Sequence, residues 1–455
     1  MTTSCSRVVA HRRSRSGGTS SSIRALARAR SILVTPALVA TALLWLSAPA
    51  AAATCSTVAA DFRLGVAAVE LDPQGNKLSK LFDNEVAVNA DGDTMFVNQP
   101  LKERDRLYLY PLGAVGGGEV VATGGDTAPN GKTFSKNAVF RNVSINDPQD
   151  LAFSASFMGG GHGVFVREFG GALETAADTF TTAVPVVGGF FASFRSVSLI
   201  NANAQIAFIG INRDGAKGVF LYDAPTDTLT NVMQKGDVTT TPAGRQVCEF
   251  VEVGLGDSGE VVVRGTTDSV AGGCDGAAGA VFYTDAGDIV EIARHGEASP
   301  IPGFNYGVFT DGVFMNASGN SVFRASAGGG RCLFLHDPTG PSTTDLVCQG
   351  DATPAGGTFG VPAIYQLADT DEAFLVANVV GGPTLEGIFS ANGGTATILT
   401  RETATPADVF AGGRYTNFLA MGIDAGATHL VFRAALKETP PKQTARQAIV
   451  SCTLP

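Results

Sequence analysis

Tryptophan, histidine and charged residues are scarce in this sequence of 455 residues. It has one tryptophan, Trp45, and five histidines, and only 16% of its residues are charged. The histidines beyond residue 53 show no His-x-x-x-His spacing, and no Cys-x-x-Cys pair occurs; these histidines are His162, His295, His336 and His429. A metal centre needs three or four converging ligands, so we interpret them as scattered surface or turn residues.

Acidic residues are missing from the first 53 positions, which instead carry seven arginines. An apolar run from Ile32 to Leu46 follows, and small residues lead to Ala53. This order predicts an export signal over residues 1–53 and one domain over residues 54–455. An uncleaved signal anchor is the alternative, but Pro36 within the run and the alanine-rich exit favour cleavage. We expect a secreted, periplasmic or cell-surface monomer, with no membrane span in the mature chain.

Basic residues are outnumbered once the signal is removed. Of the 32 lysines and arginines, 25 remain against 42 acidic residues, which gives a net charge of −17. Such a surface repels nucleic acid, so we expect no nucleic-acid partner. Seven cysteines become six when Cys5 leaves with the signal, and an even number in an exported chain indicates disulfides.

A repeated pattern, Asn-x-x-Gly-x-x-x-Phe, is what the sequence has in abundance. Clear copies begin at residues 89, 146, 201 and 316, and weaker copies at 256, 367 and about 424, so the period is about 55 residues. A second signal, a Gly-Asp turn ending in proline, recurs in fixed phase between the copies, at 124–129, 235–242 and 349–354, as Gly-Glu at 295–300 and as Arg-Glu at 401–406. Such a period indicates one supersecondary unit stacked on itself, since a single unit cannot bury its own apolar face.

The runs within one unit predict short strands. Between residues 137 and 178, turn residues separate four apolar runs, at 138–145, 150–157, 163–169 and 172–177. Runs of this length, rich in Val, Phe and Ile, are typical of strands rather than helices. Seven four-stranded antiparallel units predict an all-β fold, a seven-bladed β-propeller. A β-solenoid is the competing architecture, but its rungs need far fewer residues than this period supplies.

The N- and C-terminal segments of the chain predict how the ring of blades closes. The last copy stops after its third strand, at residues 446–452, and the run 61–72 has no unit of its own. We expect this mature N-terminal strand to join the last blade as its fourth strand. In that position Cys55 lies opposite Cys452, and we predict a disulfide between them. The same repeat map pairs Cys332 with Cys348 and Cys248 with Cys274, each pair within one blade.

The two signals together resemble the bacterial exported tandem-repeat proteins named for an NxxGxxxAF motif. The resemblance covers roughly residues 60–452. The copies beginning at Asn146 and Asn201 lack the glycine, and three copies lack the asparagine. The resemblance implies export and a repeat fold, and it brings no known catalytic residue or ligand.

Two features invite a chemical interpretation. Ser258 lies in a Gly-Asp-Ser-Gly tetrad like that around the nucleophile of chymotrypsin-like proteases, but the tetrad coincides with a repeat turn, so we predict a hairpin there. Acidic residues gather in other turns: Asp91, Asp93, Asp126, Asp237, Asp351, Asp369, Asp371 and Glu372. Calcium in one of these loops is an alternative to simple turn formation, although none has the full Asp-x-Asp-x-Asp-Gly spacing. We expect no cofactor, catalytic or cofactor-binding residue.

The predicted function therefore rests on the repeat fold, because we expect no catalytic or cofactor-binding residue. We expect a non-enzymatic propeller that acts as a binding or scaffold module for an extracellular protein or glycan. The alternative is a propeller hydrolase or lyase, acting on an extracellular polysaccharide or a lactone-type substrate through carboxylates at the axis. A structural component of the cell envelope is a third possibility. If the long insertions near 179–193 and 266–278 form a binding face, both should lie on one rim.

Overall fold

The computed structural model describes residues 53–60, 71–113, 118–137, 140–186, 188–285, 287–340, 342–402, 414–437 and 446–455. The predicted export signal lies outside the described residues, apart from Ala53. Residues 50–455 form one compact unit. No helix of the described part is long and apolar enough to cross a membrane.

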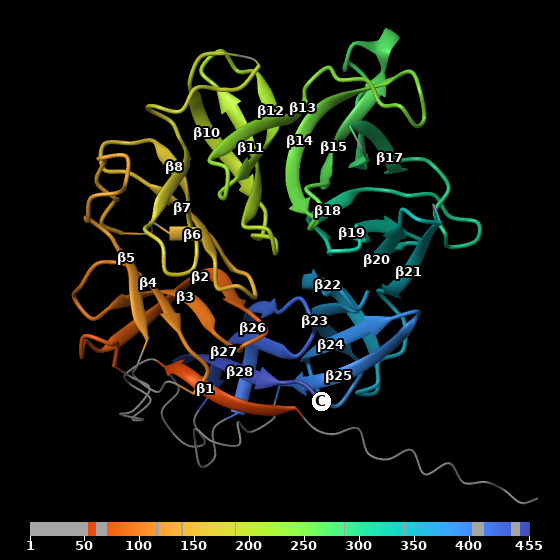
Figure 1. Ribbon diagram of the computed structural model, residues 1–455. Coiled ribbons are helices and arrows are strands. Elements are labelled where there is room, and N and C mark those ends of the chain that lie inside the picture. The colour runs from red at the N-terminus through yellow and green to blue at the C-terminus, as the bar shows by residue number, and fades with distance from the viewer. Residues whose placement is uncertain are drawn as a thin grey trace, which may run out of the picture. The chain divides into compact units, whose positions relative to one another are not determined.

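Seven four-stranded antiparallel sheets, blades 1 to 7, surround a common axis (Figure 1). The first strands of the blades lie innermost: β2 (Leu78–Val88), β6 (Phe140–Ile145), β10 (Phe191–Val197), β14 (Arg245–Leu255), β18 (Phe309–Met315), β22 (Thr358–Leu367) and β26 (Arg414–Ile423). The second strands are β3 (Thr94–Pro100), β7 (Leu151–Ser156), β11 (Gln205–Asn212), β15 (Val261–Ser269), β19 (Ser321–Ala327), β23 (Ala373–Val380) and β27 (His429–Lys437).

The two outer strands complete each blade. The third strands are β4 (Arg106–Tyr110), β8 (His162–Arg167), β12 (Lys217–Asp223), β16 (Ala278–Asp285), β20 (Gly330–Asp337), β24 (Glu386–Asn392) and β28 (Arg446–Thr453). The fourth strands are β5 (Glu119–Thr123), β9 (Glu174–Asp178), β13 (Thr228–Gln234), β17 (Asp288–Arg294), β21 (Ser342–Cys348), β25 (Thr395–Arg401) and, in blade 7, β1 (Thr54–Ala60). The predicted seven-bladed propeller is confirmed.

Strand β1 closes the ring, as predicted, by pairing antiparallel with β28 (Figure 1). The register sets Cys55 opposite Cys452, and their sulfur atoms are bonded at 2.03 Å. The strand starts at Thr54, earlier than the predicted start at 61, and is described as far as Ala60; residues 61–70 of the expected range lie outside the described part. The register is fixed at Cys55, which lies opposite Cys452. Cys55 precedes the more apolar run at 61–72.

The core fills the spaces between blades. The phenylalanines of the four clear motif copies have no exposed surface; they are Phe96, Phe153, Phe208 and Phe323. Phe153 of blade 2, for example, packs in one cluster with Met95 of blade 1. Burying a side chain of this size contributes about 1.5–3 kcal/mol. The motif phenylalanines therefore belong to the core between blades.

The alternating strand directions give the propeller two different ends. The turns between first and second strands carry the repeated motif, and we call the end where they lie the motif face. The connections between second and third strands, and those from each fourth strand to the next blade, lie at the opposite end, which we call the loop face. The predicted insertions occupy the connections 179–190 and 270–277, which both lie on the loop face.

Candidate functional site

The motif turns share one backbone geometry. In blade 3, Asn201 accepts a hydrogen bond from the Gln205 N–H at its side chain (2.8 Å), and the Ala204 N–H donates to the Asn201 carbonyl (3.2 Å). The fourth residue of all seven turns has a positive φ: Gly92, Gln149, Ala204, Gly259, Gly319, Asp371 and Ala427. The turn of blade 6 starts at Ala368, one residue after the predicted start at 367, since the Asp371 N–H donates to the Ala368 carbonyl. The left-handed backbone thus lies at the glycine position of the motif and not at the asparagine, which holds the turn through its side chain.

The same asparagines join neighbouring blades. The side-chain amide of Asn146 donates to the Asn201 carbonyl of the next blade (2.8 Å), and Asn201 donates likewise to the Gly256 carbonyl (2.9 Å). Asn316 repeats the contact with the Ala368 carbonyl at 3.1 Å. Each such bond contributes about 0.5–1.5 kcal/mol net. The repeated motif therefore has a structural role.

The second residue of the motif turns is alanine in blades 1, 3, 5 and 7 and aspartate in blades 2, 4 and 6. The aspartates Asp147, Asp257 and Asp369 each accept the backbone N–H of the alanine in the preceding blade, at 2.7–3.0 Å. All three line an axial cavity of about 290 Å³ at the motif face. Burial raises the pKa of Asp369. The hydrogen bond from the Ala317 N–H lowers this pKa, and the negative charges of Asp257 and Asp147 raise it.

A second axial cavity of about 280 Å³ lies toward the loop face. An apolar constriction separates the two cavities. It is formed by four residues that line both of them: Leu199, Leu255, Met315 and Leu367. Two carboxylates line this second cavity, and both bond to the next blade. Glu85 accepts the Val143 N–H (2.9 Å), and Glu252 accepts the Gly312 N–H (2.7 Å) and the Arg264 guanidinium (2.9 Å). The carboxylates that an axial hydrolase or lyase would use therefore already hold blades together.

The acidic turns of the sequence are tied into backbone contacts. Asp237 and Asp351 accept the N–H of the residue three positions earlier, at 2.8 and 2.7 Å, and Asp93 accepts the Leu112 N–H at 3.2 Å. Asp371 accepts the side-chain amides of Asn316 and Asn320. No three His, Cys, Asp or Glu side chains among the described residues are grouped so as to hold a metal ion.

The remaining candidates are dispersed over the molecule. Ser258 lies in the hairpin turn that the repeat predicts, where the Gly259 N–H bonds the Gly256 carbonyl at 3.2 Å. Two of the four histidines are buried, and burial lowers the pKa of His336. The structure does not bring the four histidines, which lie in or next to different blades, into one site.

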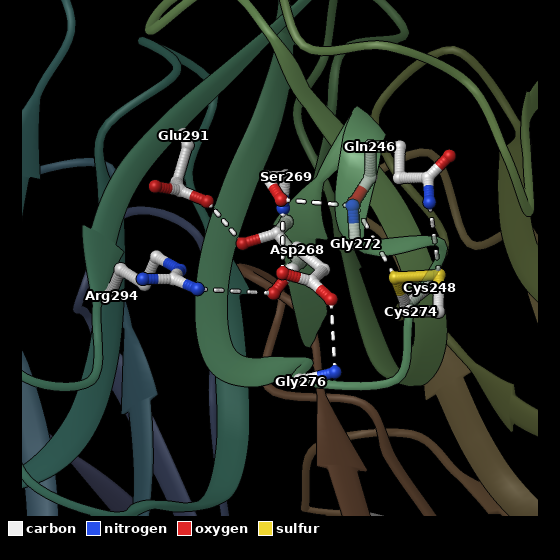
Figure 2. The surroundings of a disulfide bond; sticks show 10 residues. Gln246, Cys248, Asp268, Ser269, Gly272, Cys274, Gly276, Glu291 and Arg294 are labelled. Atoms are coloured by element: carbon white, nitrogen blue, oxygen red, sulfur yellow. Dashed lines mark hydrogen bonds between the residues drawn. A yellow bond between two sulfur atoms is a disulfide. The ribbon is translucent and has the colours of Figure 1, made fainter. Parts of the chain in front are cut away.

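A disulfide fixes one of the loop-face connections. The sulfur atoms of Cys248 on β14 and Cys274 in the connection 270–277 are bonded at 1.96 Å, and Figure 2 shows the polar side chains around them. Asp268 accepts the Gly276 N–H (3.0 Å), and Ser269 accepts the Gly272 N–H (3.0 Å) (Figure 2). The third disulfide, Cys332–Cys348 (2.03 Å), joins β20 to β21 in blade 5. The disulfide and these hydrogen bonds thus restrain the connection 270–277.

The loop face carries most of the exposed large apolar side chains among the described residues. Eleven of fourteen lie in its connections or at their edges: Leu71, Leu101, Met158, Val186, Phe190, Val238, Val270, Phe304, Val308, Val380 and Leu385. The motif face has two, Leu112 and Phe169, and the axis has Leu199. Val186, Leu385 and Val308 are 82%, 70% and 63% exposed. Single exposed apolar residues are ordinary, but concentration at one end indicates a contact surface.

Three phenylalanines at the start of blade 3, Phe190, Phe191 and Phe194, have two different roles. Phe191 and Phe194 belong to β10, the innermost strand of blade 3, and their rings pack at 5.1 Å. Phe190 lies on the loop face, under the Arg213 guanidinium at 5.4 Å. Two of the three phenylalanines therefore belong to the inner strand, and Phe190 belongs to the loop face.

Solved structures resemble parts of this propeller at low sequence identity. The β-propeller domain of the trilobed protease from Pyrococcus furiosus is 9% identical, with a TM-score of 0.48, over 80% of this chain and 93% of that one. Oligogalacturonate lyase from Vibrio parahaemolyticus is 10% identical, with a TM-score of 0.44, over 90% and 98%. TolB from Acinetobacter baumannii is 11% identical, with a TM-score of 0.34, over 81% and 78%. Likeness at this level concerns the fold alone.

A family model, and no single curated protein, matches the sequence of this chain. No curated protein matches the chain significantly in sequence. One family model matches it twice in succession, over residues 57–217 and 210–451, and thus spans nearly the whole propeller. The chain therefore belongs to the Family of unknown function (DUF7453).

Proposed function

We propose that this protein is an exported, monomeric, non-enzymatic propeller of the NxxGxxxAF type, and that its loop face binds an extracellular protein. The observation that carries the proposal is the unequal distribution of exposed apolar side chains between the two faces. The motif face has its polar side chains engaged in bonds between blades, whereas the loop face presents apolar residues at the tips of its connections.

The chemistry of these tips favours a protein over a glycan as the main partner. Aliphatic and methionine side chains predominate, and Phe190 and Phe304 are the two aromatics among the eleven. Such side chains exclude water against an apolar partner surface, but they offer sugar hydroxyls no hydrogen bonds. The disulfide in the connection 270–277 also lowers the ordering cost of binding, because that connection is already fixed.

Export is part of the same proposal. Three disulfides among the described residues are typical of an oxidising compartment, in agreement with the signal expected over residues 1–53. A secreted, periplasmic or cell-surface location supplies both the oxidising conditions and an extracellular partner.

Binding of the labelled, purified protein to the surface of the cells that produce it tests the proposal. Replacing Val308 and Leu385 with serine should weaken saturable binding by about tenfold, since each substitution removes apolar contact area. The matched control replaces Leu112 and Phe169, on the motif face, with serine and should bind as the wild type does. Treating the cells with protease should abolish binding.

Two results would overturn the proposal. Equal losses in the loop-face and motif-face variants would show that the loop face is not the contact surface. Binding that survives protease but is lost after periodate oxidation of the cells would identify a glycan as the partner instead.

A further inference from the structure

A polar pocket of about 310 Å³ lies between blades 2 and 3, at the loop-face end of their strands. Strands β6, β7 and β8 of blade 2 form one wall, and β10 of blade 3 forms the other. Its lining includes two arginines, a histidine and three neutral polar residues: Arg141, Arg195, His162, Asn142, Ser154 and Ser156. This volume is at the lower end of small-molecule sites, which suits a group of single-sugar size.

The pocket lies where blade 2 has a small residue at a position that holds an arginine in blades 4 and 5. Counted from the start of the motif, Ser154 corresponds to Arg264 in blade 4 and Arg324 in blade 5. The Arg324 guanidinium crosses to the next blade, where it bonds the Pro362 and Ala363 carbonyls of β22. Ser154 instead bonds within its own blade, since it accepts the Asn142 side-chain amide at 2.8 Å. The space that a guanidinium fills elsewhere is open here.

Positive charge with spare hydrogen-bonding capacity faces this space. Arg195 lies 3.5 Å from Glu249, but that carboxylate is already bound by Lys217 at 2.5 and 2.6 Å. Within the described part of the chain, Arg141 is exposed and has no ion-pair partner. Two guanidiniums at one pocket can bind a carboxylate through charge-assisted bonds. The net negative charge of the protein does not prevent this, because charges more than about 10 Å away are largely screened by salt.

We propose that this pocket binds an acidic sugar residue, with its carboxylate on Arg141 and Arg195. Ser154, Ser156 and Asn142 supply donors and acceptors for sugar hydroxyls, and Phe194 supplies an apolar wall for the ring. An acidic amino-acid side chain would use the arginines but would leave the rest of the pocket unfilled. The site is independent of the protein partner proposed for the apolar tips of the loop face.

Ligand-observed NMR and calorimetry with D-glucuronate as the probe test this site, with D-glucose as the uncharged comparison. The wild type should bind glucuronate and not glucose. Arg141→Gln and Arg195→Gln should each weaken binding at least about tenfold, as expected for losing a bond to a charged group. Arg331→Gln is the matched control, because it removes an exposed arginine from β20, outside the pocket, and should have no effect.

Ser154→Arg gives a second, independent test. A guanidinium at this position should take the place that Arg324 occupies in blade 5 and close the pocket. Glucuronate binding should be lost while the thermal unfolding midpoint and the binding to producing cells stay unchanged.

Three results would overturn this inference. The first is glucuronate binding no tighter than glucose binding. The second is an equal loss in the Arg331→Gln control. The third is N-acetylaspartate binding as tightly as glucuronate, which would assign the pocket to acidic peptides. None of these bears on the apolar tips, so the cell-binding comparison of the loop-face and motif-face variants stands separately.

Discussion

His336 shows how burial in this propeller acts on a single residue. Its ring is 5% exposed, its Nδ1 lies 3.0 Å from the Thr343 hydroxyl, and the Tyr283 ring packs 5.7 Å away. Burial lowers the pKa of His336 below its ordinary value of 6.5, against an opposing influence of Asp337. The unfolded chain therefore binds the proton more tightly than the folded protein does.

This difference predicts a pH dependence of stability. The contribution of His336 to the free energy of unfolding is complete above about pH 6.5 and is lost as the pH falls through the lowered pKa, by about 1.4 kcal/mol per pKa unit. Urea unfolding at pH 7.5 and 5.5 should show a smaller loss in His336→Gln than in the wild type. His295→Gln, at an exposed position, is the control and should keep the wild-type loss. An unchanged loss in His336→Gln would contradict the assignment.

Some residue roles could be predicted from the sequence, and others depend on the neighbouring blade. The motif phenylalanines are buried because they lie on apolar strands, and that pattern is local. The acceptor role of Asp257 is not local, because its partner, the Ala202 N–H, belongs to another blade. The pocket at Ser154 is likewise visible only when blade 2 is compared with Arg324 and its bonds across the interface in blade 5.

The motif turn is the element in which residue type and backbone conformation can be compared most directly, at its fourth position. Gly92 has a φ of +81°, and a Cβ there would lie 2.9 Å from the Leu112 side chain. Gln149 occupies the equivalent position in blade 2 with a φ of +70°, a conformation that side chains rarely adopt. The two copies therefore predict opposite responses to substitution.

Gly92→Ala should lower the free energy of unfolding by about 1–3 kcal/mol, because it adds both backbone strain and a close contact. Gln149→Gly should cause no loss, because it removes strain that offsets the added flexibility of the unfolded chain. Urea titration of both variants measures the contrast. An equal loss in the two would show that the fourth position of the turn does not need a left-handed backbone.

Strand positions were predictable wherever runs and turn residues alternate clearly. The expected runs at 150–157 and 163–169 overlap β7, Leu151–Ser156, and β8, His162–Arg167. The strand β10 was harder to predict because the preceding connection is also rich in apolar residues. The closing strand was misplaced because β1, Thr54–Ala60, is less apolar than the run that follows it.

For the whole molecule, ring closure is the feature that couples distant parts of the chain. The disulfide between Cys55 and Cys452 spans 397 residues, whereas that between Cys332 and Cys348 spans 16. On the chain-entropy model these bonds contribute about 6 and about 3 kcal/mol. Replacing the terminal pair with serine should therefore lower the unfolding midpoint more than replacing the pair in blade 5. The reverse order in calorimetric scans would contradict the view that β1 closes the ring.

The central claim is that the motif face holds the blades together and the loop face binds. Asn201→Ala tests it most directly when the free energy of unfolding and the binding to producing cells are measured on the same sample. Asn201 makes bonds within its turn and to the Gly256 carbonyl of blade 4, so the account predicts a loss of about 2–4 kcal/mol in stability with unchanged binding by the folded protein. Unchanged stability with lost binding would contradict it, because the motif would then be the contact surface.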